Sequence, residues 1–146
     1  MPDCESQREL PFSRQQLFAL AADVERYPDY LPGWSSVQIL EQGEVALDAL
    51  QRVSLGPFTW EFTSHAEFDA PEWIRVHSDD GPFGDLDIVW HFTAIPLGAT
   101  RVALRMQCRM RSAPLELLVS PLFERHGQAV MEAFAQRAVS IYDADS

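Results

Sequence analysis

Residues 58–68 read FTWEFTSHAEF, a stretch in which apolar or small side chains alternate with polar ones. Successive side chains of a β-strand point to opposite faces, so Phe58, Trp60 and Phe62 share one face. Threonine, glutamate and histidine side chains occupy the other face. The alternation predicts a strand with one apolar and one polar face, and another part of the chain has to cover the apolar face.

The same alternation extends from Trp34 to Arg111 and predicts a run of six strands. Turn sequences rich in glycine, proline and acidic residues separate the strands, at residues 42–43, 56–57, 69–72, 79–84 and 96–98. Strands joined by such short turns pair in antiparallel fashion and leave one face of the sheet in water. A further short strand is expected at residues 6–11, which gives a sheet of about seven strands.

Two short helical segments are expected between the first strand and the six-stranded run. Ser13 and Gln16 have the spacing of a capping box, and an apolar stretch follows them. The second segment, at residues 23–32, should be irregular, because Pro28 disfavours helical geometry at Tyr27.

A long amphipathic helix is expected at the C-terminal end of the chain. It begins near Pro114, and its apolar stripe continues to Ile141. Pro121 cannot lie undisturbed inside a helix, so it either kinks this helix or restarts it with Ser120 as the cap.

These elements predict an α+β fold in which a curved antiparallel sheet wraps around the long helix. A length of 146 residues suits one domain, residues 1–146. The aromatic side chains of the facing strands and the soft side chains of Met106, Met110 and Met131 then lie between sheet and helix. They either line a ligand pocket or fill the space as an ordinary core, and the pattern is compatible with both.

The charge of the chain bears on its partners. All eleven basic residues are arginine, twenty-two residues are acidic, and the net charge is −11. Such a charge repels phosphate backbones and anionic lipids, so direct nucleic-acid binding and docking through a basic patch are not expected. No secretory signal or membrane-spanning stretch is recognisable, which predicts a cytoplasmic protein.

The sequence offers little for catalysis or metal binding. His65 and His91 fall on the outward face, and no two histidines have the spacing of metal ligands. The inward faces carry chiefly Ser64, Cys108 and Gln51 as polar groups, with no inward carboxylate or histidine. We therefore expect no enzymatic activity, no metal and no resident cofactor.

Three stretches resemble the coenzyme Q-binding proteins of the START-like, polyketide cyclase/dehydrase superfamily. They are DVERYPDYLP at residues 23–32, GPF leading to WHF within residues 81–92, and AFAQRA at residues 133–138. The resemblance covers about residues 9–138. One departure is PGWS at residues 32–35, which inserts a glycine and lacks the family's cysteine after tryptophan.

The resemblance implies the helix-grip fold and a non-catalytic carrier of a ubiquinone-like polyprenyl quinone that supports respiration, with transient contact to the inner membrane. It also implies that the first and last strands pair, which would bring Cys4 near Cys108; no disulfide is predicted. The residues expected to bind the ligand are Tyr27, Leu31, Trp34, Phe58, Trp60, Phe62, Ile88, Trp90, Phe92, Met106, Met110, Leu118, Phe123, Met131 and Phe134.

Two alternatives to the carrier follow from the same superfamily. One branch is named for ribosome association toxins, which implies a ribosomal partner. Another contains polyketide aromatase/cyclases, which are enzymes. Residues 27–34 are interpreted either as a mobile lid over the pocket or as a rigid cap on the core.

Overall fold

Seven antiparallel strands form one curved sheet in the computed structural model, which describes residues 3–142. The order across the sheet is β1-β7-β6-β5-β4-β3-β2. The strands are β1 (Asp3–Leu10), β2 (Trp34–Gln42), β3 (Ala46–Leu55), β4 (Phe58–Asp69), β5 (Trp73–Ser78), β6 (Phe83–Ile95) and β7 (Ala99–Met110). Strands β2 to β7 follow one another as hairpins, as the alternating run predicts.

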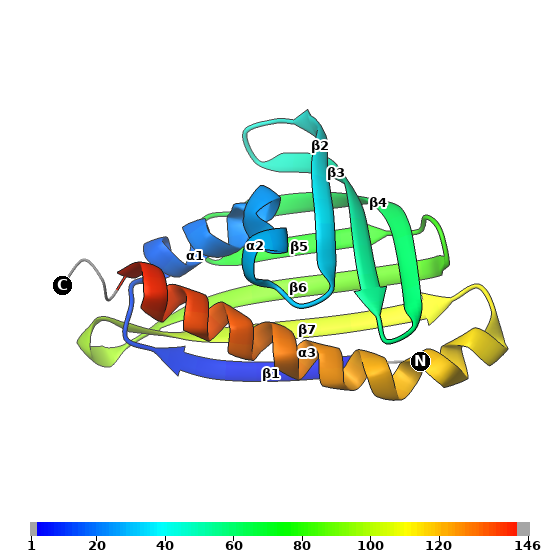
Figure 1. Cartoon of the computed structure of the whole chain (residues 1–146). Helices are drawn as coiled ribbons and strands as arrows, with labels where there is room; N and C mark the ends of the chain where they lie inside the picture. The colour runs from blue at the N-terminus through cyan, green and yellow to red at the C-terminus, as the bar shows by residue number, and fades with distance from the viewer. Residues whose placement is uncertain (1–2, 143–146) are drawn as a thin grey trace.

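The sheet is completed by strand β1, which pairs with β7 at the other end of the sequence. The register places Cys4 opposite Met106 and Leu10 opposite Thr100. The strand begins at Asp3, before the predicted start at Ser6, because β7 offers pairing partners along its whole length. Figure 1 shows β1 and β7 side by side at the lower edge of the sheet.

Three helices and a short 3-10 turn lie on one face of the sheet (Figure 1). They are α1 (Arg14–Ala22), the turn Val24–Arg26, α2 (Tyr27–Tyr30) and α3 (Ala113–Tyr142). A second 3-10 turn, Pro96–Gly98, connects β6 to β7. The capping box predicted at Ser13 and Gln16 is present, with both of its hydrogen bonds formed.

The prediction that Tyr27 is pushed out of helical geometry is wrong. Its backbone is helical, with φ −52° and ψ −41°. Pro28 occupies the first turn of α2, where the missing N–H of proline is tolerated.

Helix α3 runs across the concave side of the sheet for 30 residues, with Pro121 inside it. Ser120 does not cap a new helix; its hydroxyl donates to the carbonyl of Glu116 at 2.9 Å. The helix therefore continues through the proline. Its buried side comprises Val119, Phe123, Gly127, Val130, Met131, Phe134, Ala135 and Ala138.

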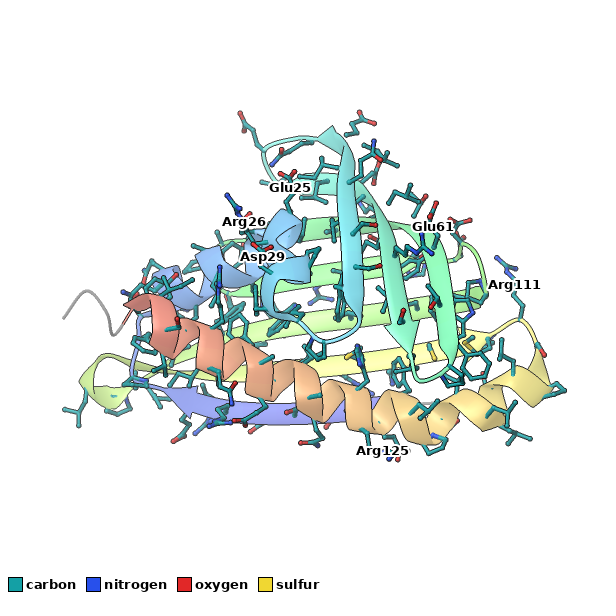
Figure 2. All side chains as sticks on the ribbon, in the orientation of Figure 1. Glu25, Arg26, Asp29, Glu61, Arg111 and Arg125 are labelled. Carbon is teal, nitrogen blue, oxygen red and sulfur yellow. The ribbon has the colours of Figure 1, made fainter. Side chains whose placement is uncertain are left out.

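The burial of each strand follows its sequence alternation. In β7, every second residue from Thr100 to Met110 is buried, whereas Arg101, Arg105 and Arg109 are exposed. Charged side chains such as Glu25, Glu61 and Arg125 project away from the interior (Figure 2). The apolar faces of the sheet and α3 thus enclose the core.

Candidate functional site

A hollow lies between the sheet and the helices, and it is divided into two chambers. The first is bounded by strands β3 to β7, the segment from Val24 to Trp34, and Val130 of α3. The second lies toward the start of α3, against Val119, Phe123 and His126. Their cavity volumes are small, about 30 Å³ and about 40 Å³. Both are narrow, because side chains approach each other closely throughout.

Trp34 separates the two chambers and lines both of them, as do Ile88 and Met106. Its ring meets Tyr27 edge-on, with the ring centroids 5.8 Å apart, and stacks on His126 at 5.5 Å. Because Trp34 has the largest of the three side chains that line both chambers, we call it the partition of the hollow.

Glycine precedes the partition for a steric reason. Gly33 has φ +88°, and a Cβ built there would lie 2.4 Å from the carbonyl oxygen of Ser54. The inserted glycine of the PGWS stretch therefore lets β2 pass close to β3.

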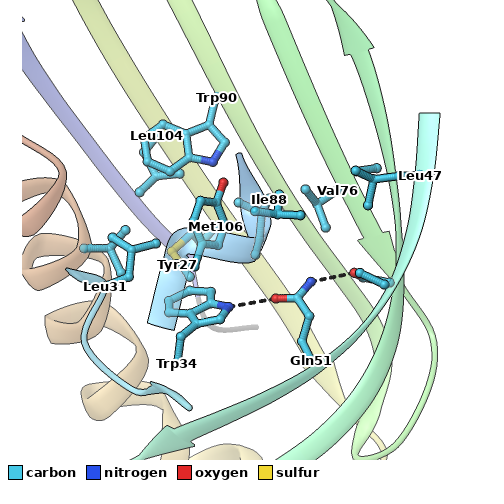
Figure 3. Close-up of a pocket in the computed structure, with 15 residues that line it drawn as sticks. Tyr27, Leu31, Trp34, Leu47, Gln51, Val76, Ile88, Trp90, Leu104 and Met106 are labelled. Carbon is cyan, nitrogen blue, oxygen red and sulfur yellow. Dashed lines mark hydrogen bonds between the residues drawn. The ribbon is translucent and has the colours of Figure 1, made fainter. Parts of the chain in front are cut away.

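The first chamber is apolar except for a short row of polar side chains. The indole Nε1 of Trp34 donates to Gln51 Oε1 at 2.7 Å, and Gln51 Nε2 donates to Ser64 Oγ at 2.6 Å (Figure 3). Gln51 is only 8% exposed and Ser64 only 3%. Three neighbouring strands, β2, β3 and β4, supply these residues.

His126 borders the second chamber, where no histidine was expected. Its Nε2 atom is buried and has no hydrogen-bond partner among residues 3–142. Burial lowers the pKa of its imidazole below the ordinary value. The ring is thus neutral at pH 7 and can either donate or accept a hydrogen bond.

His126→Gln is expected to change how stability depends on pH. The unfolded chain takes up a proton at a higher pH than the buried imidazole does, so His126 destabilises the fold as pH falls below its ordinary pKa. Removing it should therefore reduce the loss of melting temperature between about pH 8 and about pH 5. Thermal denaturation across that range measures this difference.

His65→Gln is the matched control, with an effect of opposite sign. Its hydrogen bond to Asp48, 2.6 Å long, raises the pKa of His65. The stabilisation by His65 is complete below its ordinary pKa and is lost as pH rises through the raised value. Parallel pH profiles for His126→Gln and wild type would contradict the buried, neutral imidazole.

Nine of the residues expected to bind a ligand line the chambers. They are Tyr27, Leu31, Trp34, Trp60, Phe62, Ile88, Trp90, Met106 and Phe123. Five others lie in the packed layer around the chambers, where Phe134 contacts Trp90, Phe92 contacts Phe18 and Phe58 stacks on Trp60. Met110 and Met131 are buried in the same layer.

The expectation that Leu118 faces the interior is wrong. Its side chain is 62% exposed, beside Leu117, which is 79% exposed. In this first part of α3 the buried stripe passes through Val119 and Phe123 instead. The run of apolar residues there does not reveal which of them points inward.

The remaining clusters of titratable residues lie on the outer face of the sheet. His77 Nδ1 is 3.3 Å from Asp85 and 3.1 Å from Asp87, a grouping that has the atoms for a metal ion but is largely exposed. His91 stacks on Trp73 with the ring centroids 3.8 Å apart. Both lie on the side of the sheet opposite the hollow.

Cys4 and Cys108 are buried free thiols. Cys4 contacts α3, and its Sγ donates to the carbonyl of Glu124 at 3.3 Å. Burial raises the pKa of Cys108 to about 12, and burial is also the main reason that the pKa of Cys4 is raised. Both groups are thus protonated thiols at neutral pH, the unreactive form.

Comparison with known families relates most of the chain to one of them. The sequence profile described as "Polyketide cyclase / dehydrase and lipid transport" matches residues 10–135. Two relatives are called "Ribosome association toxin RatA". The one from Pseudomonas aeruginosa is 32% identical, covering 91% of this chain and 92% of its own, and the one from Vibrio cholerae is 34% identical, covering 90% and 91%.

Solved structures share the fold at low sequence identity. A START superfamily protein from Mycobacterium smegmatis superposes with a TM-score of 0.84 at 14% identity, covering 95% of this chain and 98% of its own. The Zhui aromatase/cyclase from Streptomyces sp. R1128 superposes with a TM-score of 0.70 at 21% identity, covering 98% and 88%. The fold is therefore one that occurs with different activities.

Proposed function

Because this chain belongs to the polyketide cyclase/dehydrase and lipid transport family, we propose that it binds a ubiquinone-like polyprenyl quinone in its two chambers, as a carrier that catalyses no reaction. The observation that supports this proposal is the lining of the hollow, which is aromatic and aliphatic apart from a few buried polar atoms. Such a lining suits an apolar tail with a small polar head.

Burial of the tail supplies most of the affinity. A buried CH₂ group contributes about 0.8 kcal/mol, so one five-carbon isoprene unit contributes about 3–4 kcal/mol. A few units offset the entropy lost on association. Because the chambers are narrow, the tail must displace apolar side chains as it enters.

The lining also supports a binding role over catalysis. No carboxylate lines either chamber within residues 3–142. His126 is the one imidazole at the hollow in that part of the chain, and no acid orients it. General acid–base catalysis requires a positioned proton donor or acceptor whose pKa suits the reaction, usually held by a partner.

Entry of the ligand involves the wall formed by residues 27–34. Tyr27 is buried and donates its hydroxyl to the carbonyl of Ala21, while Arg137 of α3 lies over the ring of Tyr30 at 5.2 Å. These contacts hold the wall closed. The carrier collects its ligand at the inner membrane surface through transient opening of this wall. No helix within residues 3–142 is long and apolar enough to cross a membrane.

Filling the first chamber tests the proposal. Ala49 is 1% exposed on β3 and lines that chamber, so Ala49→Leu places a larger apolar side chain where the tail would lie. We expect binding of a short-chain ubiquinone to weaken by at least about tenfold. The larger side chain also overpacks a buried site, so we expect it to lower the free energy of unfolding by about 1–3 kcal/mol while the protein remains folded. Isothermal titration calorimetry and thermal denaturation measure the two effects.

Ala94→Leu is the matched control, because this alanine lies on β6 and is exposed. The control should bind the quinone as wild type does. If a folded Ala49→Leu protein binds the quinone as tightly as wild type does, the ligand lies outside the first chamber. If wild type binds no quinone, the carrier proposal is contradicted.

Association with the ribosome is the second candidate function. It is favoured by the two relatives at 32% and 34% identity that are named ribosome association toxins. A net charge of −11 disfavours contact with ribosomal RNA, so the partner would be a ribosomal protein. Sedimentation of ribosomal subunits with wild type and with the Ala49→Leu variant separates the two functions, because only a cavity-dependent function responds to the filled chamber.

A further inference from the structure

The buried row Trp34–Gln51–Ser64 has a fixed hydrogen-bond direction. An indole N–H can only donate, so the oxygen of the Gln51 amide must face Trp34. The amide nitrogen then faces Ser64, and the Ser64 hydroxyl has to accept from it. The indole N–H of Trp34 thus fixes the orientation of the Gln51 amide, and the amide fixes the Ser64 oxygen as an acceptor.

This direction leaves two hydrogens without an acceptor, the second amide N–H of Gln51 and the O–H of Ser64. The Ser64 oxygen is engaged by Gln51, but its own O–H is free to donate, and no acceptor lies within hydrogen-bond distance of it among residues 3–142. Ser64 is only 3% exposed, so bulk solvent does not serve the hydroxyl. A buried donor without an acceptor is unfavourable and can be satisfied by a bound molecule.

The position of this donor relates it to the first chamber. Ser64 and Gln51 both line that chamber, and Leu47, Ala49 and Ala66 surround them with apolar surface. Ser64 lies opposite Ala49 in the β3–β4 register. Within residues 3–142, the Ser64 O–H and the second amide N–H of Gln51 are thus adjacent free donors in an otherwise apolar part of the wall.

We propose that Ser64 determines ligand specificity by donating its hydroxyl hydrogen to a carbonyl oxygen of the ligand. The inference rests on the proposed function and identifies the group of the ligand that the site recognises. Trp34 and Gln51 act as positioning residues, because they hold the serine oxygen as an acceptor and so keep its hydrogen available. The expected ligands are apolar molecules whose polar end group carries an oxygen that accepts a hydrogen bond, as a quinone ring does.

A pair of matched probes tests this recognition. Decyl-benzoquinone and decylbenzene carry the same tail and ring framework, but only the first has carbonyl oxygens. Calorimetric titration of wild type should show tighter binding of the quinone by about fivefold to tenfold, the difference expected for one hydrogen bond to a neutral donor.

Ser64→Ala should remove that preference. Its affinity for decyl-benzoquinone should fall by about fivefold to tenfold, while its affinity for decylbenzene stays within about twofold of wild type. Ser64→Thr keeps the hydroxyl and should retain the preference. Ser36→Ala changes an exposed serine on β2 and is the control for serine replacement as such.

The outcomes separate this inference from the proposed function. Wild type that binds neither probe overturns the proposed function. Wild type that binds both probes equally, with Ser64→Ala unchanged, overturns the role of Ser64 and leaves the apolar chamber as a binding site. Thermal denaturation of each variant confirms that it is folded, and the ratio of the two affinities within one variant is independent of its stability.

Discussion

Phe134→Ala is expected to lower the free energy of unfolding by about 3–5 kcal/mol, the range for removing a buried phenylalanine side chain. Phe134 is 0% exposed on α3, and its ring centroid lies 4.8 Å from that of Trp90 on β6. The contact joins the helix to the centre of the sheet. Removing the ring leaves a void beside Trp90 that the curved sheet cannot close, because neighbouring strands are held by their own hydrogen bonds.

Urea denaturation followed by circular dichroism measures the loss. Val139→Ala, on the same helix, is the control: Val139 is 44% exposed, and its replacement should change the free energy of unfolding by less than about 0.5 kcal/mol. A loss below about 1 kcal/mol for Phe134→Ala would contradict the tight packing of helix on sheet.

Gly127→Ala is expected to destabilise the protein by about 1–3 kcal/mol, because it overpacks a close contact. A Cβ at Gly127 would lie 2.1 Å from the Cys4 Sγ and 3.0 Å from its Cβ. In an exposed helix interior the same replacement stabilises by about 1 kcal/mol, so the predicted sign is reversed here. The free energy of unfolding of the variant tests this sign.

A double-mutant cycle with Cys4→Ala identifies the cause. Removing the sulfur vacates the space that the new methyl group needs, so Cys4→Ala/Gly127→Ala should lose less stability than the sum of the single changes. Gly43→Ala is a second comparison, because a Cβ built at Gly43 lies 3.6 Å from its nearest neighbouring atom, an ordinary van der Waals distance. Additive losses in the cycle would show that the contact between β1 and α3 is not the cause.

Much of the fold could be predicted from the sequence because the sheet has one wet face. In β4 and β7 the alternation of apolar and polar residues matches the alternation of buried and exposed side chains. Sequence signals from neighbouring residues gave wrong predictions where pairing between distant strands or tertiary packing determines the local structure. The start of β1 depends on β7, and the helical form of Tyr27 depends on its packing against Tyr30 and Trp34.

The candidate site could be predicted only in its apolar part. The strand residues facing inward follow from the period of two, which predicts inward positions for Trp60, Ile88, Trp90 and Met106, and these four residues line the hollow. His126 was missed, since the orientation of a helical residue depends on the rotation of α3 about its axis. The direction of the Trp34–Gln51–Ser64 row requires the positions of atoms on three strands, and no sequence pattern encodes it.

The pairing of β1 with β7 has a consequence for the order of folding. The first strand finds its hydrogen-bonding partner only after the ribosome has made residues near Met106, and α3 is made later still. Until then α3 does not cover the apolar faces of the nascent hairpins. Contacts between such distant parts of a chain also make folding slow. The fold is therefore completed only after α3 has been made, and the nascent chain depends on protection from aggregation in the interval.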